Sequence, residues 1–348
     1  MIRSTSTINS KHPPFIVAEM SANHNQSLDK ALLIVEAAAR AGAHGLKIQT
    51  YTADTLTLNV DNPDFFINDK NSLWNGRSLY DLYQEAHTPW EWHKPIFDRC
   101  KELGIVGFST PFDETAVDFL EDLDVPMYKV ASFESNHLPL LRKIAKTGKP
   151  IMVSTGMATI DDITEIISTI REIGNNQIIL LKCTSAYPAL PEEANLKTIP
   201  YLRKLFDCEV GLSDHTIGTT VAVGSIAFGA TVVEKHFTIS RSDGGVDSAF
   251  SIEPNELSLL VRDSQIAWKA LGRVSRHAFN KEEKSVIFRR SLYISKNMKR
   301  GEVFRYGDNI RIVRPGFGLA PKELDKFIGR KVKHNVKAGT RVSLDLLE

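Results

Sequence analysis

Two histidines occupy matching positions at the ends of two strand-like runs, His215 in residues 209–216 and His236 in residues 231–238. Alternate residues of a strand share one face, so Ser213 points to the same side as His215. If the two runs are neighbours in a parallel barrel, both imidazoles meet at the rim where such barrels keep their chemistry. This arrangement predicts a divalent-cation site with open positions for water and substrate, and the donors suit Mn²⁺ or Mg²⁺. A pair of hydrogen-bonded structural histidines is the alternative interpretation.

Polar residues also end the other strand-like runs, although buried parallel strands are usually apolar throughout. Lys47 and Lys129 interrupt apolar runs, and because a buried lysine needs a partner, they predict an anion site. Hydroxyl groups nearby complete a ring of donors suited to a phosphate and a carboxylate. Besides the two histidines, the polar residues expected at this rim are Glu19, Lys47, Gln49, Thr110, Lys129, Ser132, Glu134, Ser154, Lys182, Thr184, Tyr187, Ser213 and Glu234.

Structural roles are the competing interpretation for single members of this set. A lone lysine in a strand is usually a surface residue that keeps its ammonium group in water. Glu234 has two open interpretations: a carboxylate that supports the metal ligands, or a structural ion-pair partner of Lys182.

The elements that must position these residues are strands alternating with helices. The strand-like runs are 15–22, 45–50, 105–112, 127–132, 150–156, 178–185, 210–216 and 231–238. Helical periodicity marks 28–39, 160–170 and 257–271. Ser27 is placed to cap the first of these helices, and Thr159 with Asp162 forms a capping box before the second. This alternation predicts an α/β fold, a (β/α)8 or TIM barrel over residues 1–272. A doubly wound sheet is the competitor, but we find no Gly-rich dinucleotide fingerprint and no P-loop.

One connection in this pattern is unusually long, from about residue 51 to residue 101. It carries Tyr80, Tyr83, Trp90 and Trp92. Long connections of this kind are usually lids or binding loops, and some only decorate the surface.

The pattern changes after residue 272. Residues 273–290 are rich in charged side chains and predict a linker. Residues 291–348 predict a small domain with short β runs at 291–295, 311–313 and 341–344 and a short helix at 321–328. A core of this size is marginally stable alone, so we expect the domain to dock on something larger.

Composition excludes several classes of protein. The chain has 348 residues, of which 42% are hydrophobic and 24% charged, and a net charge of +1. That charge does not support nucleic-acid binding. Cys100, Cys183 and Cys208 lack zinc-site spacing and indicate buried free thiols in a reducing cytoplasm. No run has the character of a signal peptide or the length of a membrane span, so we expect a cytoplasmic protein without membrane or nucleic-acid partners.

Taken together, these motifs resemble the sialic-acid synthase family of the bacterial type over almost the whole chain. The motifs that carry the resemblance are IVAEMSANHN (16–25), LKIQ (46–49), TPWEWH (88–93), FSTPF (108–112), YKVASFE (128–134), VSTGM (153–157), GLSDHT (211–216) and EKHFT (234–238). In the tail, RSLY (290–293) and RPGFGLAP (314–321) are similar to the family's antifreeze-like SAF domain, a β-clip fold. The resemblance implies a TIM barrel followed by a SAF domain.

The family condenses phosphoenolpyruvate with an N-acetylated amino sugar to give a nine-carbon 2-keto acid and phosphate. The resemblance implies that His215 and His236 hold the Mn²⁺ or Mg²⁺ ion, that Glu134 is an acid/base residue, and that Glu19 has a catalytic role. Arg314 would reach the sugar from the partner chain of a domain-swapped homodimer. The implied phosphoenolpyruvate ligands are Lys47, Thr110, Lys129, Ser132, Ser154, Ser213 and, with a departure from the family's asparagine, Thr184; the implied sugar contacts are Gln49, Tyr187, Asp247 and Arg314.

Two segments depart from the commonest sialic-type pattern, AEMSANHNQS (18–27) and LKIQTYTAD (46–54). Both are similar to the pseudaminic acid synthase branch, whose sugar would be 2,4-diacetamido-2,4,6-trideoxy-L-altrose. N-acetylneuraminate and legionaminate synthases, which use other acetamido sugars, are the alternatives.

Other functional classes fit the residues less well. A Schiff-base aldolase would use Lys129 or Lys235 as its nucleophile and would need no histidine pair. A metal-dependent sugar isomerase or hydrolase could use the same barrel, but would release no phosphate from phosphoenolpyruvate. A carbohydrate-binding protein built around the C-terminal domain would not need the polar rim.

Overall fold

The structure is a computed structural model that describes residues 8–70, 72–274 and 280–348. It divides into two compact units, Met1–Gly272 and Arg273–Glu348. Each unit has its own hydrophobic core and is described by itself.

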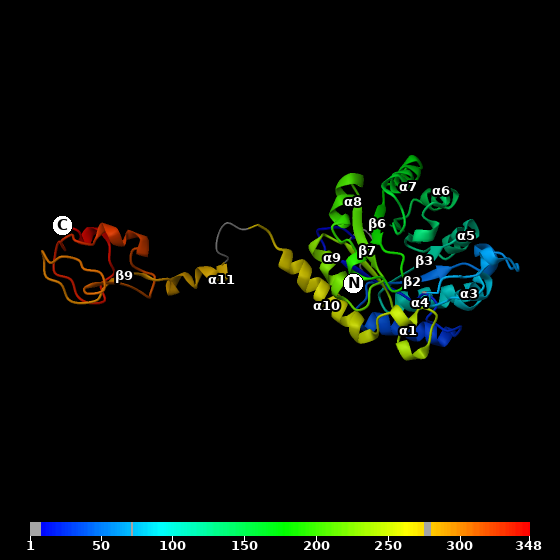
Figure 1. The fold of residues 1–348 in the computed structure, drawn as a ribbon, viewed down its shortest axis with the longest axis horizontal. Coiled ribbons are helices and arrows are strands. Elements are labelled where there is room, and N and C mark those ends of the chain that lie inside the picture. Colours follow the sequence, from blue (N-terminus) through cyan, green and yellow to red (C-terminus); the bar gives the residue numbers. More distant parts are fainter. Residues whose placement is uncertain (1–7, 71, 275–279) are drawn as a thin grey trace. The chain divides into compact units, whose positions relative to one another are not determined.

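The first unit is a closed barrel of eight parallel strands ringed by helices (Figure 1). This confirms the predicted TIM barrel. The last strand pairs with the first, which places Glu19 opposite His236. The strands are β1 (Phe15–Glu19), β2 (Gly45–Thr50), β3 (Val106–Pro111), β4 (Tyr128–Val130), β5 (Ile151–Ser154), β6 (Ile178–Cys183), β7 (Glu209–Asp214) and β8 (Val232–His236).

Helices follow the strands and bury their apolar faces against them. Ser27 accepts a hydrogen bond from the Lys30 amide at the start of the first helix, and Thr159 forms the predicted capping box with Asp162. Both predicted helix starts are therefore confirmed. The helices around the barrel are α1 (Leu28–Arg40), α4 (His93–Glu102), α5 (Glu114–Asp122), α6 (Leu138–Lys146), α7 (Ile160–Glu172), α8 (Thr198–Phe206), α9 (Thr220–Ala227) and α10 (Pro254–Leu271).

Apolar side chains fill the barrel interior at one end only. The interior cluster contains Ile8, Phe15, Val17, Val106, Phe108, Met127, Met152, Ile179, Leu181 and Val232. Ile8 and Met127 precede β1 and β4, and the other residues come before the polar or thiol side chains that follow on the same faces of their strands. Packing therefore confines the polar groups to the carboxyl ends of the strands, where barrel enzymes carry their sites.

The described part of the long connection between β2 and α4 contains four short helices. It contains α2 (Ala53–Leu56), η2 (Pro63–Phe65), α3 (Leu79–Ala86) and η3 (Trp90–Trp92). Trp90 stacks on Phe119 with ring centroids 4.6 Å apart, and Trp92 packs edge-on against His24. These two tryptophans therefore seat the end of the connection on the barrel.

The second unit is small and built from short elements. Its strands β9 (Ser291–Ile294) and β10 (Ile310–Val313) are antiparallel. Around them lie α11 (Asn280–Glu283), η8 (Val286–Phe288), η9 (Pro321–Lys326) and η10 (Leu344–Leu346). The prediction of a third β run at 341–344 is wrong, because Arg341 forms only an isolated bridge with Tyr293 and the chain then turns into η10. The predicted short helix at 321–328 is present as the 3-10 helix η9.

In the described part of the chain, no helix combines the length and the apolar character that crossing a bilayer requires.

Candidate active site

A cavity of about 360 Å³ opens at the carboxyl ends of the barrel strands. Every second residue of a strand faces the barrel interior, so the polar residues that follow the apolar interior cluster point into the cavity from the barrel side. The predicted site residues that line it are Glu19, Lys47, Gln49, Lys129, Ser132, Glu134, Ser154, Tyr187, Ser213, His215, His236 and Asp247, and Glu234 lines it too.

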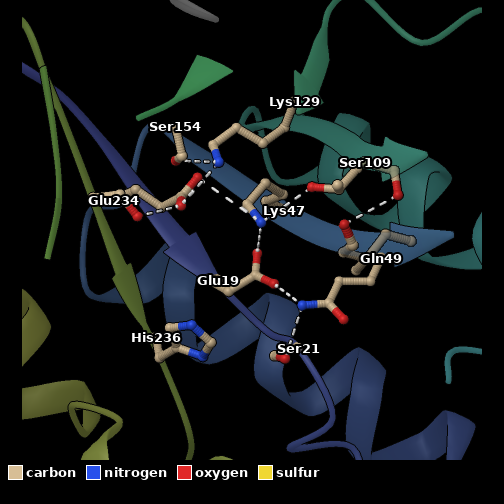
Figure 2. Close-up of polar contacts among 12 residues, drawn as sticks. Glu19, Ser21, Lys47, Gln49, Ser109, Lys129, Ser154, Glu234 and His236 are labelled. Atoms are coloured by element: carbon tan, nitrogen blue, oxygen red, sulfur yellow. Dashed lines mark hydrogen bonds and ion pairs between the residues drawn. The ribbon is translucent and has the colours of Figure 1, made fainter. Parts of the chain in front are cut away.

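We call the polar residues at the strand ends, which include Glu19, Lys47, Lys129, Ser154, Ser213 and Glu234, the cavity floor. Lys47 is at the centre of a first group of contacts on this floor (Figure 2). Its Nζ lies 2.7 Å from Glu19 Oε2 and donates a hydrogen bond to Thr110 Oγ1 at 3.3 Å. Gln49 Nε2 donates to Glu19 Oε1 and to Ser21 Oγ, both at 3.0 Å, which fixes the carboxylate from the other side. Burial lowers the pKa of Lys47, but attraction to the nearby carboxylates outweighs it and the pKa is raised. Lys47 is therefore a permanent buried cation.

Glu234 links this group to the second lysine (Figure 2). Its Oε1 lies 3.6 Å from Lys129 Nζ, its Oε2 lies 3.9 Å from Lys47 Nζ, and Ser213 Oγ donates to Oε1 at 2.9 Å. Lys129 Nζ also donates to Ser154 Oγ at 2.6 Å. Burial raises the pKa of Glu234, but the two lysines outweigh it and lower the pKa, so the carboxylate is ionised. The floor thus holds two ammonium groups, their carboxylates and a set of hydroxyls.

Two predictions for the sixth strand are wrong. Ile179, Leu181 and Cys183 face the barrel interior, so Lys182 and Thr184 face outward. Lys182 Nζ donates to Thr184 Oγ1 at 2.6 Å and to the Glu193 carbonyl at 3.1 Å. Glu234 pairs with Lys47 and Lys129, so the ion pair suggested between Lys182 and Glu234 is not formed in the described part of the chain. The Thr184 side chain does not line the cavity.

The two histidines meet at the rim as the sequence suggests. Their ring centroids are 5.3 Å apart and the ring planes are inclined at 62°. His215 Nδ1 lies 2.8 Å from the Thr184 carbonyl, and since a carbonyl only accepts, Nδ1 carries a proton and Nε2 is the nitrogen that a metal ion would bind. His236 Nδ1 is buried without a hydrogen-bond partner, and the nearest carboxylate oxygen, on Asp247, is 3.9 Å away.

These observations fit a metal ion. Burial lowers the pKa of His236, and repulsion from His215 and Lys47 lowers it further, so its ring is neutral and able to ligate. Within the described ranges, no group of three or more His, Cys, Asp or Glu side chains could hold a metal ion. A cation between His215 and His236 would therefore take its remaining ligands from water and substrate, as an open catalytic site requires.

The end of a third strand, β6, brings Cys183 to the same place, which no sequence motif predicts. Its Sγ lies 3.9 Å from His215 Nδ1, and it lines the cavity. Burial raises the pKa of the thiol, but His215 and Lys129 outweigh burial and lower it to about 7. Tyr187 packs against the His215 ring, with the two ring centroids 4.4 Å apart.

Glu134 enters the cavity from the single turn η4 (Ser132–Glu134), directly after β4. Gly156 donates its amide hydrogen to Ser132 Oγ at 3.1 Å, and a Cβ at Gly156 would lie 2.7 Å from that oxygen, so only glycine allows this approach. Glu134 Oε2 is buried without a partner. Burial raises the pKa of this carboxyl to about 7, so at neutral pH it can hold or release a proton.

Three predicted site residues stand apart from the cavity lining. Thr110 lies just behind it, against Lys47. Thr184 faces outward, as described. Arg314 belongs to the second unit, where it is exposed and lines a surface hollow with Arg311, Phe317 and Arg341. Asp247, by contrast, lies in the cavity and accepts a hydrogen bond from Ser21 Oγ.

One side of the cavity is apolar, and Tyr83 is the only one of its residues that the sequence indicates. They come from the connection between β2 and α4, whose length was the only signal. The apolar wall, as we call it, consists of Leu56, Ile67, Trp74, Leu79, Leu82 and Tyr83. Trp74 Nε1 donates to the Val246 carbonyl at 3.3 Å, which anchors the wall to the loop after β8.

Comparison with known proteins agrees with this geometry. The model of the NeuB family matches residues 34–276, and the SAF domain matches residues 289–348. The chain belongs to the NeuB family. Pseudaminic acid synthase of Campylobacter jejuni (strain 81-176) is 46% identical over 325 residues, which cover 93% of this chain and 94% of that protein. Pseudaminic acid synthase of Helicobacter pylori (strain ATCC 700392 / 26695) is 42% identical over 337 residues, covering 97% of this chain and 98% of that protein.

Among solved structures, N-acetylneuraminic acid synthetase from Leptospira borgpetersenii is similar, with a TM-score of 0.71 and 29% sequence identity. The match covers 79% of this chain and 90% of that one. The resemblance to sialic-acid synthases that the sequence motifs suggested is thus confirmed.

Proposed function

We propose that the protein is a transferase that condenses phosphoenolpyruvate with 2,4-diacetamido-2,4,6-trideoxy-L-altrose. The products are a nine-carbon 2-keto sugar acid and phosphate. The observation that carries the proposal is one cavity that holds two buried lysines, a histidine pair and a carboxyl with a pKa of about 7. The similarity to pseudaminic acid synthases over most of the chain supports this sugar. N-acetylneuraminate or legionaminate synthesis is the alternative.

Phosphoenolpyruvate would bind on the cavity floor. Lys47 and Lys129 would meet its phosphate and carboxylate charges, and Ser132, Ser154 and Ser213 would donate hydrogen bonds. The lysines are already held in place by Glu19 and Glu234, so little reorganisation accompanies binding. Thr110 would act through Lys47, which it contacts.

The sugar would react in its open-chain form above this floor. Carbon 3 of phosphoenolpyruvate attacks the aldehyde carbon, and the cation that develops at carbon 2 takes up water. The tetrahedral product then expels phosphate by breaking the bond between carbon 2 and the bridging oxygen, which leaves the keto group. Glu134 would give a proton to the aldehyde oxygen, and Gln49, Tyr187 and Asp247, which line the same cavity, would orient the sugar.

His215 and His236 would hold the Mn²⁺ or Mg²⁺ ion. The ion would supply Lewis-acid polarisation of the aldehyde oxygen. Tyr187 packs against the His215 ring and limits its movement, while the Thr184 carbonyl fixes its tautomer. Thr184 would thus contribute through its backbone, not as a direct phosphoenolpyruvate ligand.

Arg314 would complete the sugar site from a second copy of the chain, in a domain-swapped homodimer. Its guanidinium group is exposed within the small second unit. The three cysteines are free, which fits an enzyme of the reducing cytoplasm.

A phosphate-release assay tests the proposal. Phosphoenolpyruvate and Mn²⁺ are incubated with a panel of acetamido sugars that includes N-acetylmannosamine. We expect phosphate only when a sugar is present, and the highest kcat/KM with the diacetamido trideoxy sugar. Phosphoenolpyruvate with a heavy oxygen isotope in its bridging position should release that isotope in phosphate. Isotope retained in the keto acid would refute cleavage of the carbon–oxygen bond.

The same assay separates the Schiff-base alternative. Burial lowers the pKa of Lys129, so this amine deserves the test. Lys235 does not line the cavity and forms a buried ion pair with Asp214 at 2.8 Å. Borohydride should trap no covalent adduct in the presence of either substrate. An adduct on Lys129 would contradict the metal-dependent condensation.

A further inference from the structure

The cavity is divided into two halves of opposite character. The floor consists of charged and hydroxylated residues from the barrel strands, whereas the apolar wall comes from one continuous segment, residues 56–83. No charged side chain from this segment is among the cavity-lining residues that the structure describes. The protein therefore presents a surface without charge to one part of whatever it binds.

Helix α3 explains how the segment forms this wall. Leu79, Leu82 and Tyr83 stand at positions i, i+3 and i+4, which share one helix face, and this face lines the cavity. Asp81 is exposed on another side. Leu56, Ile67, Trp74 and Leu79 remain only partly buried, and they line the cavity. An occupant with an apolar group would bury them further.

The Tyr187 ring lies between the histidine pair and Trp74, an aromatic residue of the apolar wall. Tyr187 lies 4.4 Å from His215 and 6.2 Å from Trp74, measured between ring centroids. Under the proposed function, the sugar aldehyde lies at the histidines. The remaining carbons must then extend past Tyr187, and the far end of the sugar meets Trp74 and its neighbours.

The hydrogen-bonding capacity of Trp74 is already used. Its indole nitrogen donates to the Val246 carbonyl at 3.3 Å, so its ring offers the cavity an apolar surface. A hydroxyl group held against Leu56, Ile67, Leu79 or the Trp74 ring would lose water without gaining a partner. A methyl group at the same place would gain from burial.

We propose that the apolar wall determines sugar specificity by binding the 6-methyl group of the substrate and disfavouring a 6-hydroxyl group. The inference rests on the proposed function and adds Leu56, Ile67, Trp74 and Leu79 as specificity-determining residues. Hydrophobic pockets discriminate only moderately against an added hydroxyl group, so the preference for the 6-deoxy sugar is about 10- to 100-fold in kcat/KM.

The test uses a matched pair of sugars, 2,4-diacetamido-2,4,6-trideoxy-L-altrose and its 6-hydroxy counterpart. The wild-type protein prefers the first by the factor given above. Trp74→Ala and Leu56→Asn reduce the preference to within about threefold, mainly by slowing the 6-deoxy sugar. The matched controls are Leu73→Ala and Leu58→Asn, whose side chains are 52% and 59% exposed and do not line the cavity. Both controls keep the wild-type preference.

Calorimetric binding of both sugars in the presence of inorganic phosphate provides a readout that needs no turnover. Equal kcat/KM and equal affinity for the two sugars, or binding of neither, would overturn the role of the wall. An unchanged preference in both Trp74→Ala and Leu56→Asn would overturn it as well. Preferred turnover of N-acetylmannosamine would instead refute the proposed sugar. The ratio of kcat/KM between the two matched sugars would still test whether the apolar wall determines specificity.

Discussion

Lys47 Nζ lies 2.7 Å from Glu19 Oε2, and the two side chains are only 5% and 1% exposed. Because water hardly reaches either side chain, each charge is stabilised mainly by the other, and removal of one leaves an uncompensated buried charge. Both residues also line the cavity, where Lys47 would meet the anion of the proposed function.

Lys47→Ala should destabilise the substrate-free barrel by about 3–5 kcal/mol, since it leaves a buried carboxylate without its closest cation. The measurement is urea unfolding followed by tryptophan fluorescence, which reports the barrel because every tryptophan lies before residue 273. Lys143→Ala is the control, since Lys143 pairs with a largely exposed Asp118 at 2.6 Å and should lose no more than about 1 kcal/mol. Equal losses in the two variants would contradict the buried pair.

Glu134 should make stability depend on pH. Its carboxyl has an ordinary pKa of 4.5 and a pKa of about 7 in the folded protein, because burial favours the neutral form. The stabilisation is complete below pH 4.5 and is lost as the pH rises through 7. Glu134→Gln is neutral at every pH, so it should match the wild type at pH 4.5 and exceed its stability by about 2–3 kcal/mol at pH 8. A difference between the two proteins that does not change with pH would exclude the raised pKa.

Metal binding should require both histidines. Exhaustive chelation should abolish turnover, and His215→Ala or His236→Ala should weaken Mn²⁺ binding by at least about tenfold. Electron paramagnetic resonance counts free Mn²⁺ and gives the affinity without an activity assay. His137→Ala is the control because this side chain is exposed and does not line the cavity. Full activity after chelation, or wild-type affinity in His215→Ala, would rule out the metal site.

Ser154 and Thr184 should behave differently although both end a strand. Ser154→Ala removes the hydroxyl that Lys129 contacts at 2.6 Å and should raise the KM for phosphoenolpyruvate by about tenfold. Thr184→Val should leave that KM unchanged and lower stability by about 1 kcal/mol, because it removes only the outward contacts to Lys182 and Glu193. Steady-state kinetics and urea unfolding distinguish the two effects. A higher KM in Thr184→Val would restore its predicted role as a ligand.

Arg314 should act in trans. Arg314→Ala and Glu134→Gln should each be nearly inactive alone. In a mixed dimer, the barrel with intact Glu134 receives Arg314 from the other chain, so co-expression should restore about one quarter of wild-type activity. Wild-type chains co-expressed at the same level give the reference value. Mixed dimers without activity would show that Arg314 does not reach the neighbouring site.

The sequence was informative wherever a strand had one apolar end and one polar end. In β8, Val232 is in the interior cluster and Glu234 and His236 line the cavity, as the period of two requires. Strand β6 reads IILLKC, and its first four residues are apolar on both faces, so alternation does not distinguish the inward face from the outward face. The sequence therefore predicts the wrong face for Lys182 and Thr184 and does not indicate Cys183.

The partners of charged residues could not be read from the chain. Glu234 reaches Lys47 and Lys129, which are more than a hundred residues away, because barrel closure brings β8 close to β2 and β4. The apolar wall was equally hidden, since Leu56, Ile67 and Trp74 have no periodic spacing and only the folded connection gathers them.

Because a single segment between β2 and α4 forms the whole apolar wall, one continuous stretch of the gene encodes that wall. Recombination or grafting could exchange residues 53–86 as a cassette while the strand-borne half stays intact. Under the proposed function, such an exchange would change sugar specificity and leave the phosphoenolpyruvate site on the strands unchanged.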